Sequence, residues 1–194
     1  MNYPVAKPIH RHAMPGTPQP SGTRDTVFSA IRLNKFTARR AAGITRSAYE
    51  EHGLDGKPRP LDHFHITVVH FGLYLELGDE GISRASRACG AAAARIEPFQ
   101  AQLNQLKSFS ARPGRAAPLV LVNDRRHTGE AVEMGLAEGK PPKFTPHVTT
   151  AYSMRRIPPQ PVGPISWKVT ELVLIHSFVG RTKYEELGRW SLGA

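Results

Sequence analysis

The sequence predicts an α+β fold built from two similar halves. The tripeptide His-x-Thr occurs twice, at residues 65–67 and 147–149, and each copy lies in a run of β-branched, aromatic and aliphatic residues typical of a strand. Each copy follows a predicted strand and a predicted helix, so the order strand, helix, motif strand repeats. We therefore expect a bilobal pseudo-twofold fold, in which antiparallel sheets flank a central cleft and the helices lie on the outside.

The first half contains two predicted helices between predicted strands. Apolar residues recur with helical spacing in the first helix, and alanine is abundant in the second. Prolines indicate a loop before the first motif strand. The expected elements are a strand over 25–33, a helix over 36–52, a loop through Pro58 and Pro60, the motif strand, a helix over 79–96 and an extended segment over 99–110.

The second half repeats this order. Pro146 stands directly before His147, where it can begin a strand without removing a hydrogen-bond donor from its middle. The expected elements are a strand over 118–123, a helix over 124–138, the second motif strand and a closing stretch over 167–190, with a strong strand (VTELVLIHSF), a turn at Gly180 and a returning segment.

Residues 1–23 hold five prolines and no periodic apolar pattern, which predicts a flexible leader before a single domain over 24–194. Apolar runs such as APLVLV are strand-sized, far from the roughly 20 residues that span a bilayer. The chain has a single cysteine, Cys89, so it cannot form an intramolecular disulfide, as is usual for proteins of a reducing compartment. We expect Cys89 to be buried in a helix. We expect a cytoplasmic monomer with no membrane segment.

The charge is strongly positive: 26 Lys and Arg against 16 Asp and Glu give a net charge of +10. Such a balance favours polyanionic partners through electrostatic steering and counterion release. The charge alone is explained equally well by a generic basic protein whose charge mainly serves solubility.

Each His-x-Thr string would present an imidazole and a hydroxyl on one face of its strand, because successive side chains of a strand point to opposite faces. Two such strands meeting would combine two histidines and two threonines. These are suitable groups for moving two protons around a phosphate, since the pKa of histidine, about 6.5, lets neutral and charged forms coexist near neutrality.

HITVVHFG and FTPHVTTAYS resemble the two signatures of the two-histidine phosphoesterase superfamily, in its 2′-5′ RNA ligase and cyclic phosphodiesterase branch. VFSAIRL and LVLIHSFVGRTKYEELGRWSL are similar to the family's first strand and C-terminal segment, so the resemblance spans about residues 25–192. It implies ATP-independent, metal-independent chemistry on 2′,3′-cyclic phosphates or 2′-5′ linkages of RNA. His65 and His147 would be the catalytic pair, and Thr67 and Thr149 the phosphate ligands.

The chain departs from the family at one position. Several relatives carry a basic residue three positions after the second Thr, whereas this chain has Tyr152, followed by Arg155 and Arg156. Tyr152, Arg155 and Lys143 flank the second motif and are candidates for holding phosphate or stacking a base. An ordinary solvated basic strand end is the alternative.

Opening a cyclic phosphate with water requires a base to take a proton from the nucleophile and an acid to give one to the leaving ribose oxygen. We expect His147 as the base and His65 as the acid, with roles that exchange with the direction of reaction. The two threonine hydroxyls would donate to the phosphoryl oxygens as charge grows there.

Metal and cofactor sites are not expected. His63 and His65 would face opposite to His70 on a regular strand, which disfavours zinc, and His10 and His12 lack an evident third ligand.

The sequence contains no Walker loop, no dinucleotide-binding fingerprint and no GxSxG elbow. His176 is expected in the core or at its rim. Two hypotheses remain: a phosphoesterase acting on RNA or nucleotide cyclic phosphates, and a non-catalytic RNA-binding module with a basic cleft.

Overall fold

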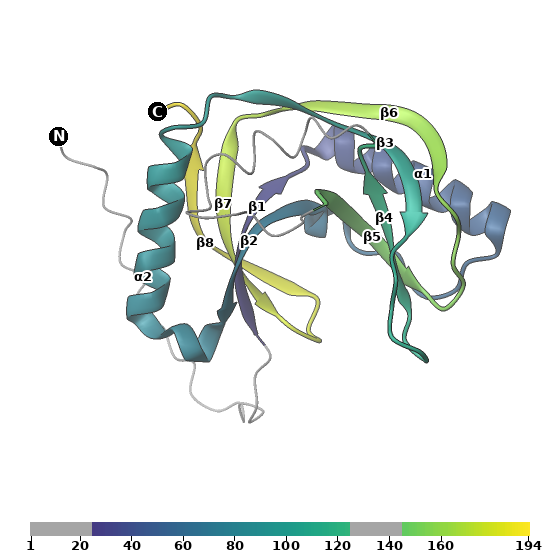
Figure 1. Ribbon diagram of the computed structural model, residues 1–194, viewed down its shortest axis with the longest axis horizontal. Coiled ribbons are helices and arrows are strands. Elements are labelled where there is room, and N and C mark those ends of the chain that lie inside the picture. The colour runs from purple at the N-terminus through teal and green to yellow at the C-terminus, as the bar shows by residue number, and fades with distance from the viewer. Residues whose placement is uncertain (1–24, 125–144) are drawn as a thin grey trace.

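The computed structural model describes residues 25–124 and 145–194 (Figure 1). The predicted leader and, apart from Asp124, the predicted helix over 124–138 lie outside the described residues. The elements are β1 (Thr26–Arg32), α1 (Lys35–His52), the 3-10 helix η1 (Leu61–His63), β2 (His65–Leu73), α2 (Tyr74–Ala93), β3 (Phe99–Ser108), β4 (Ala117–Val122), β5 (His147–Ser153), β6 (Gln160–Val169), β7 (Glu171–Phe178) and β8 (Lys183–Ser191).

The strands form one antiparallel sheet in the order β6-β3-β4-β5-β2-β1-β7-β8, which confirms the α+β class. From here on, the first half means strands β2, β1, β7 and β8 of the sheet, and the second half means β6, β3, β4 and β5. These groups differ from the two halves of the sequence, because β3 lies with the second motif strand and β7 and β8 lie with the first. Within each half, neighbouring strands pair over several residues, whereas β2 and β5 pair only at Ile66 and Val148. The two motif strands therefore meet at the centre of the sheet.

Both helices pack on the same side of the sheet, where the main hydrophobic core lies. Figure 1 shows α2 beside β7 and β8, whereas α1 lies beside the second half, although it follows β1 in the sequence. His52 of α1 contacts Gln160 of β6, with 3.1 Å between Nε2 and Oε1. Helix α1 therefore follows β1 of the first half in the sequence and packs against the helix side of the second half.

The two helices predicted over 36–52 and 79–96 are confirmed, and local chemistry explains their bounds. Asn34 caps α1, because its side-chain oxygen accepts a hydrogen bond from the backbone N–H of Thr37 at 2.8 Å, and Gly53 ends it with φ of +57°. Helix α2 begins before the predicted start, but Gly78 is non-helical, with φ of +58°, so the continuous helix begins close to residue 79. Cys89 is fully buried on α2, as expected.

One strand is not predicted, and one prediction about local structure is wrong. No element is assigned from the sequence directly before Trp167, where Pro161 and Pro164 stand, yet β6 includes both prolines, since it is an edge strand whose outer donors need no partner. His63 does not share a strand with His65: the turn that starts at Pro60 places it in η1, where the N–H of His63 donates to the carbonyl of Pro60.

Candidate active site

The two His-x-Thr motifs lie side by side on the sheet. Ile66 and Val148, their central residues, pair directly and are buried toward the helices. Because side chains alternate along a strand, both histidines and both threonines point to the opposite side, which we call the motif face. Antiparallel pairing around Ile66 and Val148 sets the histidine of each motif across from the threonine of the other. The motifs are thus related by a local twofold axis.

A backbone carbonyl orients each imidazole in the same way. Nδ1 of His65 lies 2.7 Å from the carbonyl oxygen of His63, and Nδ1 of His147 lies 2.8 Å from that of Thr145. A carbonyl only accepts, so Nδ1 carries the proton and donates in both cases, and Nε2 is the nitrogen that can exchange a proton with a substrate. Nε2 of His65 lies 3.2 Å from Oγ1 of Thr67.

The strands that flank the motifs differ between the halves. On β1, Arg32 lies opposite His65. On β4, Val122 lies opposite His147. Residues opposite each other in an antiparallel pair share a face, so a cation stands beside the first histidine and a buried aliphatic side chain beside the second.

Aromatic rings enclose His65. Phe28 stacks on it with 4.9 Å between ring centroids, and Tyr184 approaches edge-on at 5.5 Å. The pKa of His65 is lowered to about 4. Burial is the largest cause, the carbonyl hydrogen bond opposes it, and the nearby positive charges of Arg59 and Arg32 add to the lowering. His65 is therefore neutral at physiological pH.

His147 has a more open environment. Its hydrogen bond to Thr145 is exposed to solvent, whereas that of His65 is partly buried. Among the described residues, the ring of Phe109 contacts it edge-on at 4.8 Å.

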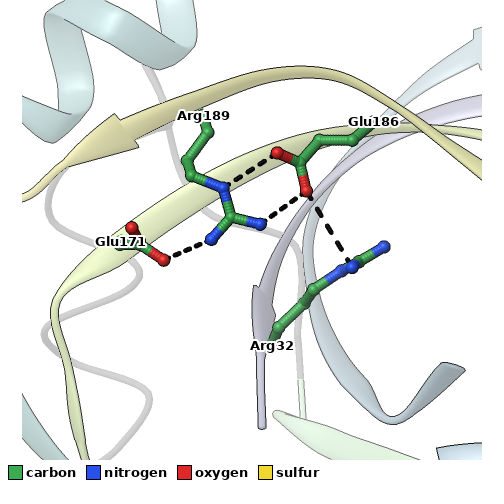
Figure 2. A network of polar contacts seen from close by, with 4 residues as sticks. All are labelled: Arg32, Glu171, Glu186 and Arg189. Atoms are coloured by element: carbon green, nitrogen blue, oxygen red, sulfur yellow. Dashed lines mark hydrogen bonds and ion pairs between the residues drawn. The ribbon is translucent and has the colours of Figure 1, made fainter. Parts of the chain in front are cut away.

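A charged network holds Arg32 beside His65 (Figure 2). Nη1 of Arg32 lies 3.9 Å from Oε2 of Glu186, and Arg189 donates to both carboxylate oxygens of Glu186 at 2.8 and 2.7 Å. Arg189 also pairs with Glu171. The positive charge of Arg32 is thus partly balanced by Glu186.

Arg59 comes from the loop between α1 and η1. Its backbone N–H donates to the carbonyl of Thr150 at 2.8 Å. Its guanidinium donates from Nη2 to the hydroxyl of Tyr184 at 2.8 Å and lies 3.2 Å from Nδ1 of His63. The guanidinium carbon is 5.9 Å from the ring centroids of both Tyr184 and Tyr152, so Arg59 stands between an aromatic ring of each half.

Asp55 fixes this loop to the end of β5. Its Oδ1 accepts hydrogen bonds from Oγ of Ser153 at 2.5 Å and from the backbone N–H of Met154 at 2.7 Å. These bonds, led by that of Ser153, lower the pKa of Asp55. At Gly56, φ is +82° and a Cβ would lie 2.4 Å from the Tyr152 carbonyl oxygen, so only glycine fits this close approach.

Not all residues predicted for the site come together. The histidines and threonines of the motifs lie on one face, as described, and Tyr152 lies exposed beside Arg59. Arg155 lies beside Gly53, at the end of α1. Its Nη1 is 3.3 Å from the position that a Cβ of residue 53 would occupy. Lys143 lies outside the described residues.

Sequence reasoning missed Arg32, Arg59 and Tyr184. The only local signal for Arg59 is its position between two prolines, where Pro60 favours an extended backbone at residue 59.

His176 lies in the core, as expected: it is 5% exposed and its ring stacks on Tyr74 at 3.8 Å. Within residues 25–124 and 145–194, no three His, Cys, Asp or Glu side chains gather as a metal site would require. Neither described α-helix combines the length and apolarity needed to cross a membrane.

Comparisons with known proteins agree on the fold. A model of the 2′-5′ RNA ligase superfamily matches residues 37–180. The crystal structure of apo LigT from E. coli is similar, with a TM-score of 0.63 and 22% identity over 89% of this chain and 100% of LigT. TT0787 of Thermus thermophilus also has a TM-score of 0.63, with 24% identity over 87% of this chain and 98% of TT0787. No curated protein sequence matches the chain.

Proposed function

Because this chain belongs to the 2′-5′ RNA ligase superfamily, we propose that it is an RNA-directed phosphoesterase that opens 2′,3′-cyclic phosphates, makes or breaks 2′-5′ linkages, or does both. The pairing of Ile66 with Val148 carries this proposal, because it places one imidazole and one hydroxyl from each half on one face. E. coli LigT has been crystallised with 3′-AMP and with phosphate, which supports a nucleotide phosphate as the ligand class.

In hydrolysis, an oxygen–phosphorus bond forms to water while the bond from phosphorus to one ribose oxygen breaks. A base removes a proton from the water, and an acid delivers one to the ribose oxygen. Thr67 and Thr149 donate hydrogen bonds to the non-bridging oxygens, where negative charge accumulates. One bond forms and one breaks at phosphorus, and one proton is taken up and one released, so the step balances.

The surroundings of the two histidines favour the reverse of the acid and base roles expected from the sequence. A neutral imidazole accepts a proton, and the low pKa of His65 keeps it neutral. We therefore assign His65 as the base and His147 as the acid in the hydrolytic direction. Ligation exchanges these roles, because the same proton positions serve both directions.

Other properties belong to the same proposal. The protein acts as a cytoplasmic monomer, with residues 24–194 as one domain and with no cofactor or metal in the reaction. Tyr152 contacts the nucleotide, and Lys143 and Arg155 contribute positive charge.

The test is hydrolysis of an RNA oligonucleotide ending in a 2′,3′-cyclic phosphate, in EDTA and without ATP. We expect turnover by the wild type and a loss of about 100-fold or more in both His65→Ala and His147→Ala. His52→Ala, which removes a histidine from the helix side of the sheet, is the matched control and should keep full activity.

RNA affinity measured on the same variants separates the two hypotheses. His147→Ala should bind RNA as tightly as the wild type while losing turnover. A wild type that binds RNA but hydrolyses nothing would overturn the enzymatic proposal and favour a non-catalytic RNA-binding module.

A further inference from the structure

Arg59 is a cation close to His65 that no carboxylate of the described residues neutralises. In the described part of the chain, its side chain contacts the hydroxyl of Tyr184, the imidazole of His63 and two tyrosine rings, all of them neutral groups. Arg32, in contrast, faces the carboxylate of Glu186. The full positive charge of Arg59 is therefore available to an anion.

The donors of Arg59 are also only partly used. A guanidinium carries five N–H groups in a fixed plane, and the protein contacts of Arg59 involve a single nitrogen, Nη2. Two other nitrogens, Nε and Nη1, have no acceptor among the described residues. A planar fork with free donors is suited to two parallel hydrogen bonds with the oxygens of a phosphate.

The loop holds this cation in place before a ligand arrives. The hydrogen bond from Arg59 to Thr150 and the pairing of Pro58 with Ala151 tie the loop backbone to β5. The Tyr184 hydroxyl fixes one edge of the guanidinium. Ordering a long side chain costs conformational entropy, so a side chain ordered in advance binds its ligand more tightly.

We propose that Arg59 binds a phosphate of the substrate at the motif face and that the exposed ring of Tyr152 beside it stacks on the attached nucleobase. This inference rests on the proposed function. Tyr152 is 43% exposed and lies on the second half, while Tyr184, which anchors Arg59, lies on the first half. The ligand class is a nucleotide with a terminal phosphate, held between the two halves.

The experiment measures binding of adenosine 3′-monophosphate by isothermal titration calorimetry and, separately, kcat and KM for the cyclic-phosphate oligonucleotide. We expect Arg59→Gln to weaken nucleotide binding and raise KM by about 10- to 100-fold, with a smaller effect on kcat. Arg59→Lys should recover part of the affinity. Arg39→Gln makes the same change of charge at an exposed position of α1 and should behave as the wild type.

A second variant tests whether Arg59 merely supports its neighbours. Tyr184→Phe removes the hydrogen bond from Arg59 but keeps the ring against His63 and His65. If Arg59 binds the phosphate directly, Tyr184→Phe should weaken nucleotide affinity by only about threefold, because it removes the ordering of the guanidinium and leaves the phosphate ligand in place. Equal losses in Tyr184→Phe and Arg59→Gln would mean that Arg59 acts only as a structural support, and would overturn the inference.

The pH profile tests whether the charge of Arg59 acts at His65. The groups facing His65 are Phe28 and Arg32 of β1, Tyr184 of β8, Thr67 of its own strand, His63 of η1, His147 of β5 and Arg59. Removing the positive charge of Arg59 makes protonation of His65 easier, so the acid limb of kcat/KM should move to higher pH in Arg59→Gln.

The outcomes separate this inference from the proposed function. A wild type that hydrolyses RNA, with unchanged KM and nucleotide affinity in Arg59→Gln, would refute the role of Arg59 and leave the function standing. A wild type that hydrolyses nothing but binds the nucleotide through Arg59 would refute the function and support the anion site.

Discussion

The two His-x-Thr motifs have the same backbone arrangement and different surroundings. In each, a carbonyl two residues earlier fixes Nδ1, and the threonine lies on the same face as the histidine. His65, however, is enclosed by Phe28 and Tyr184 with Arg32 opposite, whereas His147 has Val122 opposite. Strand pairing thus gives the two histidines matching positions, and the neighbouring side chains make the environment of one histidine unlike that of the other.

Removing the threonine hydroxyl should have the same effect on kcat in both motifs. Thr67→Ala and Thr149→Ala should each lower kcat about 100-fold, on the order of 3 kcal/mol in activation free energy, because each removes one donor to the phosphoryl oxygens. Single-turnover hydrolysis of the cyclic phosphate measures both. Serine at either position keeps the hydroxyl and is the matched control. Losses that differ by more than tenfold would contradict equal roles for the two hydroxyls.

Stability against pH should show the special environment of His65. Its folded-state pKa of about 4 lies below the unfolded value of about 6.5, so the unfolded chain takes up the proton first and stability falls as pH falls between these values. The full loss is on the order of 3 kcal/mol.

Urea unfolding of the wild type and His65→Asn, at intervals from pH 7 to pH 4, measures this effect. His63 and His176, whose pKa values burial also lowers, contribute to both proteins and cancel in the difference. Parallel stability curves for the two proteins would contradict the assigned environment of His65.

The smallest effect concerns the residues that flank the motifs. Arg32→Met removes a positive charge beside His65, so the pKa of His65 should rise. Val122→Met changes the equivalent position of the other half and should leave the pKa of His65 unchanged. NMR titration of the His65 Cε1 proton follows both variants, and a pKa that shifts equally in both would show that packing, not charge, is responsible.

Local patterns predicted those parts of the molecule that depend on local chemistry. The strand over 25–33, the helix over 36–52 and the strand over 118–123 match β1, α1 and β4, because apolar spacing and capping residues determine them. Strand β6 was missed because its prolines are tolerated only at a sheet edge, and edge position depends on the whole topology. The motif pair itself followed from the alternation of side chains along a strand.

The contributions of Arg59 and Tyr184 could not be predicted, because they depend on contacts between segments far apart in the sequence. The loop that carries Arg59 lies against β5, and its guanidinium meets Tyr184 of β8. Several relatives carry a basic residue three positions after the second Thr, where this chain has Tyr152. Here the guanidinium carbon of Arg59 lies 5.9 Å from the centroid of the Tyr152 ring. The predicted Arg155 lies instead beside Gly53. Similarly, the unequal surroundings of the two histidines depend on β1 and β4.

The strand order has a consequence for how the chain assembles during synthesis. The described strands of the second half, β3 to β6, follow one another in the sequence with no described strand of the first half between them, so they can pair with one another early. The first half cannot be completed so early, because β1 lies between β2 and β7, and β7 and β8 come after β6 in the sequence. Tyr184, on β8, therefore reaches His65 only after the other described strands have been made, so the environment of His65 is completed late.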